Sequence, residues 1–365
     1  MAAVRRWVTG SVLVAVAALV AVATVAGCTD ADDEPTSPSP QAEPEPSRSP
    51  SGQSPEGGPA DDPGTSPGST AQARAHPVSL PALFDAEYDG RGLRLGRVLF
   101  RTDAYTQRFV TYRSGDLTIS GIMDVPDGRG PFPVLVLGHG YIDPAVYVNG
   151  QGLRREQDWL ARAGYVVLHT DYRNHDASDD DPRADLRLRL DYALDMANAV
   201  LAVRRSRLPF LDGDRVGLLG RSMGGGVVYN VLAARPGLVD AAVVYSPVSS
   251  LAADNFNRWI RDDSDRSALS RRIIRALGTP ERSPGFWRDA SARTYFGRVT
   301  EPVLIHHGTA DESCPIRWSR QTYRAMRRAG VEVRMFTYPG EPHAFVAAWP
   351  LSMRRTVRFL DSHLM

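Results

Sequence analysis

Apolar runs and amphipathic segments alternate along the chain from about residue 97 to the C-terminus. Short, wholly apolar runs such as 133–137 are typical of strands that are buried on both faces of a sheet. Between them, apolar residues recur at helical spacing, and in 152–163 Leu153, Trp159 and Leu160 share one face. Strands that alternate with helices predict the α/β class, with a mostly parallel sheet and helices on both of its faces.

The predicted strands and helices follow each other with short connections. Strands are expected at 107–113, 117–125, 133–137, 165–168, 216–219, 241–245, 303–305 and 331–338, the first two as an antiparallel pair at the sheet edge. Helices are expected at 152–163, 184–206, 223–234, 316–329 and 344–364.

Residues 250–297 are polar and rich in arginine, and they carry no strand pattern. We expect them to form a small helical cap over the carboxyl ends of the strands, where α/β sheets bind ligands. Phe256, Trp259 and Trp287 are candidates for the wall of a pocket there, although packing is the commoner role of such aromatic residues.

The N-terminus has the pattern of an export signal. Arg5 and Arg6 precede an apolar run, 12–25, which ends in small residues before Cys28. This junction resembles the lipobox of bacterial lipoproteins, in which the signal is cut before the cysteine and the cysteine then carries lipid. We therefore predict a signal peptide over 1–27, lipidation of Cys28 and a membrane lipoprotein on the extracytoplasmic face. The alternative is an uncleaved membrane helix.

Residues 28–75 are dominated by proline, serine, glycine and acidic residues, and they offer little to bury. Such a composition predicts an extended, disordered tether. The folded domain is therefore expected over 76–365.

Charge and cysteine content narrow the function classes. The chain has 43 basic and 42 acidic residues and no basic block, so nucleic acid is a poor candidate partner. Its two cysteines, Cys28 and Cys314, allow neither a disulfide framework nor a thiolate metal cluster. No metal-ligand motif occurs, and we expect no metal and no cofactor. Cys314 is expected to be a small buried residue, and nothing in the sequence indicates an oligomeric state.

Gly220-Arg221-Ser222-Met223-Gly224 matches the G-x-S-x-G pattern, between a predicted buried strand and a predicted helix. In this context the pattern is a nucleophile elbow, whose sharp turn exposes the serine hydroxyl. Ser222 is therefore the predicted nucleophile, and it needs a base.

The acid and the base are expected on loops after later strands. Asp311 follows the strand 303–305 and is the predicted acid, with Glu312 as the competing carboxylate. His343 follows the last predicted strand and is the predicted base, which completes the order Ser, Asp, His. His306 and His307 lie at a strand end and are expected to be structural.

The turn 138–141 follows the strand 133–137, close to the expected site. An enzyme of this type binds the oxyanion with the amide of the residue after the serine and a second amide from this turn. We assign these amides to Met223 and Tyr141.

Taken together, these motifs resemble the catalytic domain of the prolyl oligopeptidase family, within the α/β-hydrolase superfamily. The likeness runs from about residue 117 to the C-terminus and rests on these segments: 130–134, 139–141, 163–173, 212–224, 307–311 and 338–345. It implies an α/β-hydrolase fold, with Ser222, Asp311 and His343 as the triad and the Tyr141 amide in the oxyanion hole.

Two departures from that family bear on the substrate. The residues between the tether and the hydrolase pattern are too few for the β-propeller that peptidases of the family usually carry. Met223 stands where those peptidases often have an aromatic residue and where esterases and dienelactone-hydrolase-like enzymes commonly have methionine.

Three functions remain open at this point. The favoured hypothesis is a serine hydrolase that cleaves carboxylic esters at the cell envelope through an acyl-enzyme, on a small-molecule substrate. The second is a peptidase with the same triad. The third is a surface lipoprotein that binds a ligand without catalysis, because fold does not guarantee function.

Overall fold

A nine-stranded sheet forms the centre of the computed structural model, which describes residues 75–365. The predicted signal peptide, Cys28 and all but the last residue of the predicted tether lie outside the described residues. The strands are β1 (Arg91–Arg101), β2 (Tyr105–Ser114), β3 (Leu117–Pro126), β4 (Phe132–Gly138), β5 (Val166–Thr170), β6 (Leu211–Arg221), β7 (Ala241–Tyr245), β8 (Val303–Gly308) and β9 (Val333–Tyr338).

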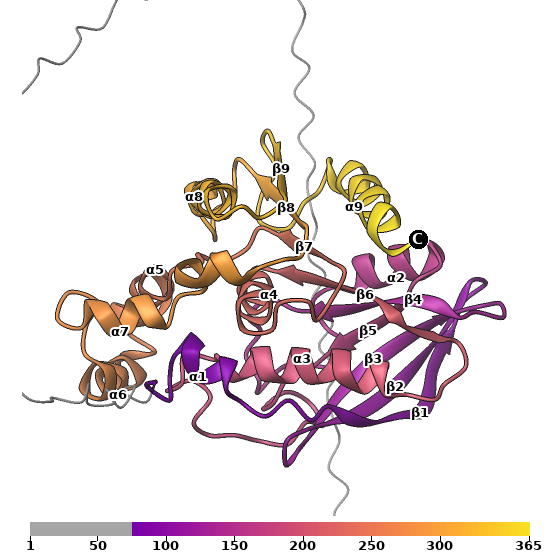
Figure 1. Cartoon of the computed structure of the whole chain (residues 1–365), viewed down its shortest axis with the longest axis horizontal. Coiled ribbons are helices and arrows are strands. Elements are labelled where there is room, and N and C mark those ends of the chain that lie inside the picture. Colours follow the sequence, from indigo (N-terminus) through magenta and orange to yellow (C-terminus); the bar gives the residue numbers. More distant parts are fainter. Residues whose placement is uncertain (1–74) are drawn as a thin grey trace, which may run out of the picture. The chain divides into compact units, whose positions relative to one another are not determined.

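The helices come mostly between these strands (Figure 1). They are α1 (Leu80–Phe84), α2 (Arg154–Arg162), α3 (Asp191–Arg204), α4 (Met223–Ala234), α5 (Ala252–Phe256), the π-helix η1 (Asn257–Arg261), α6 (Ser267–Leu277), α7 (Pro284–Asp289), the 3₁₀-helix η2 (Ala292–Arg298), α8 (Ile316–Arg328) and α9 (Trp349–Leu364). Within residues 75–365, no helix combines the length and the apolar character that a membrane span requires.

The strand order is β1-β2-β3-β5-β4-β6-β7-β8-β9. The pairs β1–β2, β2–β3 and β3–β5 are antiparallel, and all the other neighbours are parallel. The chain leaves β4 towards β5 on one side and then crosses back to β6 on the other side of β4. Such a change of direction opens a crevice at the carboxyl ends of the two strands, where α/β proteins bind ligands. The predicted class, a mostly parallel sheet with helices, is confirmed.

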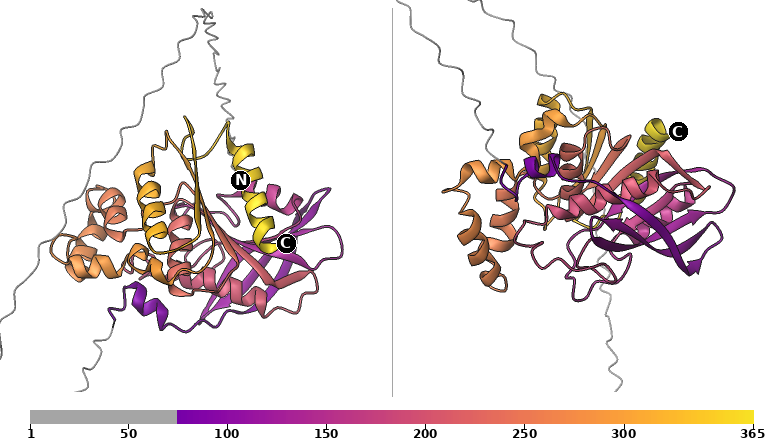
Figure 2. Two further views of the ribbon diagram at one scale, coloured as in Figure 1. Left: turned by 45° about the horizontal axis from the view of Figure 1, so that its top comes forward. Right: turned by 60° about the horizontal axis from the view of Figure 1, so that its bottom comes forward.

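Each face of the sheet has its own hydrophobic core, because successive side chains of a strand point to opposite faces. In β4, Val134 and Val136 belong to one core, whereas Leu135 and Leu137 belong to the other. Helices α3, α4 and α8 contribute to the first core, and α2 and α9 contribute to the second. Figures 1 and 2 show α2 and α9 together on one side of the sheet, with α3 and α4 on the other.

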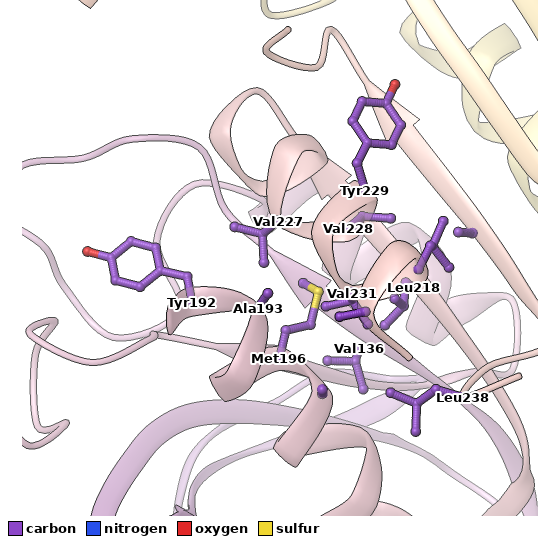
Figure 3. Close-up of a cluster of buried hydrophobic side chains, with 14 of the residues drawn as sticks. Val136, Tyr192, Ala193, Met196, Leu218, Val227, Val228, Tyr229, Val231 and Leu238 are labelled. Atoms are coloured by element: carbon purple, nitrogen blue, oxygen red, sulfur yellow. The ribbon is translucent and has the colours of Figure 1, made fainter. Parts of the chain in front are cut away.

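The first core sets the position of α4 (Figure 3). Met196 of α3 and Val231 of α4 pack over Val136 and Leu218, and all four side chains are buried. Burying a side chain of this size contributes about 1.5–3 kcal/mol. The start of α4 is therefore held firmly beside the ends of β4 and β6.

The structure corrects three of the predictions, one about the sheet edge and two about where helices begin. β1 pairs with β2 and occupies the sheet edge, so the pair β2–β3 is not the edge. The helix expected from residue 184 begins only at Asp191, because Leu188 and Arg189 have positive φ angles that a right-handed helix does not allow. The last helix begins at Trp349 instead of 344, after a loop whose Val346 and Ala348 amides donate to the Glu341 carboxylate.

Buried histidines make the fold sensitive to acid. Burial lowers the pKa of His139, His169 and His306 to about 3. Between about pH 6.5 and pH 3 the unfolded chain therefore binds more protons than the folded chain at these sites, and stability is lost as the pH falls. Burial raises the pKa of Asp124 to about 7, which acts in the opposite direction over most of this range.

We expect the free energy of unfolding, measured by urea titration, to fall by about 2 kcal/mol between pH 7 and pH 5.5. His139, His169 and His306 favour the unfolded state as the pH falls, and so does His175, whose pKa burial also lowers. Asp124 is the main group that opposes them, joined by Asp191, whose pKa burial also raises. Asp124→Asn removes the opposing group, so its stability should fall more steeply with acid than that of the wild type. A fold that is equally stable at the two pH values would contradict this account.

Candidate active site

Ser222 occupies the turn between β6 and α4, with φ of 55° and ψ of −119°. This conformation is strained for a non-glycine residue. Two glycines allow it, because a Cβ at Gly220 would overlap the Gly224 carbonyl oxygen and a Cβ at Gly224 would overlap the Gly138 carbonyl oxygen. The Ser222 amide donates to the Tyr245 carbonyl at 3.0 Å, which ties the turn to the end of β7.

Asp311 lies on the loop after β8, and its carboxylate faces the ring of His343. The Nδ1 atom of His343 is 2.9 Å from Oδ2 and 3.0 Å from Oδ1 of Asp311. The Asp311 side chain is fully buried, whereas that of His343 is 18 % exposed. A buried carboxylate in this position fixes the ring and stabilises its protonated form.

The charge of Asp311 is held by several hydrogen bonds. Burial pushes its pKa up, but hydrogen bonds from His307, His343 and the Cys314 amide outweigh burial and hold the pKa of this carboxyl well below its usual range. The amides of Ser313 and Cys314 donate to Oδ1 at 2.9 and 2.7 Å. Asp311 therefore stays ionised at neutral pH.

The competing carboxylate, Glu312, has a different partner. Its Oε2 accepts the backbone amide of His343 at 3.2 Å, not a ring nitrogen. Glu312 thus contacts the backbone of the His343 loop, and Asp311 is the carboxylate that contacts the His343 ring.

Two contacts of the Asp311 loop were not anticipated from the sequence. The buried His307 lies with Nε2 at 3.2 Å from Asp311 Oδ2 and 2.9 Å from the Cys314 carbonyl, and with Nδ1 at 2.7 Å from Ser319 Oγ. His307 therefore supports the Asp311 loop, and one of its partners is the predicted acid itself. Its position four residues before Asp311, at the end of β8, was the available signal.

Ser222 and His343 line the same cavity, but no hydrogen bond joins them in the described residues. The Ser222 hydroxyl is instead 3.9 Å from the Cys314 sulfur. Burial raises the pKa of the Cys314 thiol to about 12, so the thiol stays protonated and unreactive. Catalytic hydrogen bonds are often long or absent without substrate and form in the substrate complex.

The turn after β4 lies directly beside Ser222. A Cβ on Gly140 would come within 3.2 Å of the Ser222 Cβ, and Gly138 pairs in register with Gly220. Met223 is the first residue of α4, where backbone amides have no partner within the helix. Among the described residues, the amides of Tyr141 and Met223 donate to no other protein group, so both are available to an oxyanion.

Asp171 holds the loop that carries Tyr141, and sequence reasoning missed this role. The buried carboxylate of Asp171 accepts hydrogen bonds from Tyr147 at 2.6 Å, Asn149 at 2.6 Å and the Gly150 amide at 3.0 Å. Its carbonyl lies 3.1 Å from Nε2 of His139. The available signal was the position of Asp171 directly after β5, in one of the motifs that carry the family resemblance.

The residues from α5 to η2 form a run of helices between β7 and β8, and Figure 1 shows α5, α6 and α7 together at the end of the molecule away from β1–β3. A cavity of about 350 Å³ lies between this run and the sheet ends, and Ser222, His343 and Tyr141 line it. Phe256 and Trp259 also line it, whereas Trp287 is buried against Phe256.

Arg258 connects this helical run to the Asp311 loop. Its guanidinium donates to the carbonyl oxygens of Ser313 at 2.6 Å and Glu312 at 2.9 Å. The same segment of chain therefore covers the cavity and supports the loop that carries the predicted acid.

Two arginines near the site, Arg173 and Arg221, are held in ion pairs. Arg173 is buried and pairs with Asp195 at 2.8 Å and Asp181 at 3.2 Å, and Arg221 pairs with Glu156. Both arginines thus have a structural role. In residues 75–365 no three His, Cys, Asp or Glu side chains are grouped as a metal site would need.

Comparison with known proteins gives one family and a consistent set of relatives. Residues 151–365 match the family model described as "Prolyl oligopeptidase family". Pig (Sus scrofa) dipeptidyl peptidase 4 is 30% identical over 144 residues, which are 39% of this chain and 17% of that protein. Rat (Rattus norvegicus) acylamino-acid-releasing enzyme is 26% identical over 212 residues, 56% of this chain and 28% of that enzyme. The chain thus spans less than a third of the length of these curated relatives.

Solved structures share the fold. The acylaminoacyl peptidase of Pyrococcus horikoshii matches with a TM-score of 0.56 and 20% identity, over 72% of this chain and 42% of that one. Acetyl xylan esterase 1 of Thermoanaerobacterium sp. JW/SL YS485 matches with a TM-score of 0.59 and 20% identity, over 77% of this chain and 92% of that one. The predicted α/β-hydrolase fold is confirmed.

Asp311 contacts the ring of His343 and Glu312 contacts its backbone amide, so variants of the two residues should behave differently. Asp311→Asn removes the acceptor that fixes the His343 tautomer, so labelling of Ser222 by a fluorophosphonate should slow by about 10³–10⁴-fold. Glu312→Gln is the matched control, and it should leave the labelling rate close to that of the wild type. Equal losses in the two variants would rule out the assignment of Asp311. Thermal unfolding of both variants checks that each is folded.

Proposed function

The chain belongs to the prolyl oligopeptidase family of serine hydrolases, and from this premise we propose that it cleaves carboxylic esters through an acyl-enzyme. Ser222 is the nucleophile, His343 the general base and Asp311 the acid that orients it. Tyr141 and Met223 supply the oxyanion amides. Membership of this family sets aside the hypothesis of a binding protein without catalysis.

In the first step, the Ser222 hydroxyl oxygen attacks the ester carbonyl carbon, and its proton passes to Nε2 of His343. The Asp311 carboxylate accepts a hydrogen bond from Nδ1–H of His343 and stabilises the imidazolium that results. The carbonyl oxygen becomes an oxyanion and accepts hydrogen bonds from the amides of Tyr141 and Met223. Collapse of this intermediate expels the alcohol, which takes the proton from His343, and leaves an acyl group on Ser222.

In the second step, a water molecule gives a proton to His343 and attacks the acyl carbon. The oxyanion forms again, the Ser222–acyl bond breaks, and His343 returns its proton to Ser222. The products are a carboxylic acid and the free enzyme.

The observation that carries the ester proposal is the character of the cavity walls. Beside Ser222 the lining is largely apolar, with Val227, Phe256, Trp259 and Ile260 among its residues. A peptidase that holds the charged amino terminus of its substrate would need an unpaired carboxylate, because a buried ammonium is costly without one.

The described lining of the cavity offers no such carboxylate. Asp185 is its one acidic residue, and Arg189 already pairs with it at 2.7 Å. The cavity therefore suits an acyl group without a positive charge.

A peptidase remains the second candidate because the curated relatives are peptidases. One of them is an enzyme named for releasing acylamino acids, whose products carry an acylated nitrogen in place of an ammonium. Such a group also fits a cavity without a free carboxylate. In favour of the ester, the esterase structure above is matched over nearly its whole length, whereas less than half of the peptidase structure is matched.

The place of action is a proposal from the sequence alone. The signal pattern over 1–27 and its small residues before Cys28 support export and lipidation at Cys28. Lipidation would anchor the chain to the outer face of the membrane. The composition of 28–75 suits a tether that holds the enzyme away from the bilayer.

Assays on matched chromogenic esters and amino-acyl or N-acyl-amino-acyl anilides test the reaction class. We expect ester turnover that Ser222→Ala lowers by more than about 10³-fold. Ser362→Ala, on α9 and away from the cavity, should behave like the wild type. Anilide cleavage that depends on Ser222 would favour the peptidase, and activity that is equal in the wild type and Ser222→Ala would refute the proposal.

Metabolic labelling with a radioactive fatty acid in a bacterial host tests the anchor. The full chain should incorporate the label and partition into detergent, and Cys28→Ser should lose both properties. Cys314→Ser is the matched control and should keep the label. Membrane association that persists in Cys28→Ser without any label would favour the uncleaved membrane helix.

A further inference from the structure

Two arginines, Arg189 and Arg266, line the cavity beside Ser222. Arg189 comes from the segment between β5 and α3, and Arg266 comes from the helical run between β7 and β8. Their guanidinium carbons lie 4.5 Å and 4.7 Å from the centre of the Tyr141 ring. Both cations therefore lie next to the residue whose amide is proposed to bind the oxyanion.

The Arg189 guanidinium is only partly engaged by protein groups. Its Nε pairs with Asp185 at 2.7 Å, whereas its Nη1 has only the weak sulfur acceptor of Met223, at 3.7 Å. Its side chain is 21% exposed. Arg189 thus contacts both residues of the proposed oxyanion hole and keeps donors available.

The positive charge of Arg266 has even weaker partners than that of Arg189. Its nearest carboxylate, Asp263, is 3.9 Å away, and Nη1 donates to the Trp259 carbonyl at 3.1 Å. At 3.9 Å the carboxylate is too distant for a hydrogen bond. The positive charge of Arg266 is therefore not neutralised by a close partner in the described residues.

The backbone that carries Arg189 is in an unfavourable conformation. Leu188 and Arg189 have φ angles of 53° and 57°, and neither is a glycine. Such angles are unfavourable for a residue with a side chain, and this kind of strain collects at functional sites. The conformation ends the turn before α3 and leaves Leu188 and Arg189 in the cavity wall.

The charge balance of the cavity follows from these contacts. Arg189 and Arg266 are its two arginines, and Asp185 is the one carboxylate of its described lining. The carboxylate neutralises one cation, so one positive charge remains unmatched even when His343 is neutral. A guanidinium binds carboxylates strongly because it offers two parallel donors.

We propose that the preferred substrate carries a carboxylate close to the scissile ester, and that Arg266 and Arg189 bind this carboxylate in the cavity. This inference rests on the proposed ester hydrolysis and specifies its substrate class. The ester carbonyl lies against Ser222, and the carboxylate extends past Tyr141 to the two guanidinium groups. Both arginines recognise substrate here, and neither takes part in proton transfer.

Two pairs of esters test the proposal, one for each side of the scissile bond. On the acyl side, 4-nitrophenyl hemisuccinate is compared with 4-nitrophenyl butyrate, which has the same chain length and no charge. On the alcohol side, 4-acetoxybenzoate is compared with phenyl acetate. In at least one pair, the wild-type kcat/KM should be about tenfold higher for the acidic ester, mainly through a lower KM. Moderate salt should reduce this preference.

Arg266→Gln is the decisive variant because its side chain lies at the cavity and forms no close ion pair. It should remove most of the preference for the acidic ester, by lowering kcat/KM for that ester far more than for its neutral partner. Arg189→Lys keeps the charge and should keep part of the preference, whereas Arg189→Gln should lose it. Arg288→Gln is the matched control, since Arg288 lies on α7, is 67% exposed and is not part of the cavity lining.

The outcomes separate this inference from the proposed function. Turnover of neutral esters that depends on Ser222, without preference for an acidic ester in either pair, overturns the carboxylate proposal and leaves the esterase proposal intact. A preference that survives Arg266→Gln and Arg189→Gln also overturns it. A preference that Arg288→Gln removes equally would show a general charge effect and would count against the site.

Discussion

The close approach of β4 and β6 at their carboxyl ends is the constraint on which the site depends. Gly220 and Gly224 permit this approach and bring the start of α4 against both strand ends, because a Cβ at Gly220 would overlap the Gly224 carbonyl oxygen and a Cβ at Gly224 would overlap the Gly138 carbonyl oxygen. This contact forces the strained turn at Ser222 and places the Tyr141 turn beside it. The hydrophobic core under α4 holds this arrangement, because α4 cannot move away without exposing buried side chains. Strain at the serine is thus maintained by packing that lies outside the site.

The helical run between β7 and β8 links parts of the site that are far apart in sequence. Arg258 from this run binds the backbone of the Asp311 loop, while Trp259 and Arg266, only one and eight positions further on, line the cavity. Substrate contacts and the proposed acid are therefore supported by one segment. A change in this segment is therefore expected to alter both the pocket and the Asp311 loop, which Arg258 holds together with His307.

Sequence patterns were sufficient for most of the fold because the sheet interior is so regular. Val134 to Leu137 is typical of a doubly buried strand, since the apolar run is too short for a helix and is flanked by proline and glycine. The patterns failed where tertiary contacts decide. β1 shows only a brief apolar alternation, at Leu93 and Leu95, and pairs along its length with β2. Residues 184–190 have helical composition but turn at Leu188 and Arg189. The start of α9 was predicted too early because amides of the preceding loop donate to the Glu341 carboxylate.

The sequence by itself determined the chemistry that depends on local geometry. A strand, a G-x-S-x-G turn and a helix specify an exposed serine, and the chain order of Asp311 and His343 specifies which loops can reach it. Only the tertiary structure decided between Asp311 and Glu312 as the partner of the His343 ring, since adjacent residues differ by orientation and not by pattern. It also decided the roles of Asp171 and the two cavity arginines. The groups that donate to Asp171 from the Tyr141 loop lie 21 to 24 positions from it, and Tyr141, whose ring both arginines contact, lies still further from each of them. No local pattern encodes contacts at such separations.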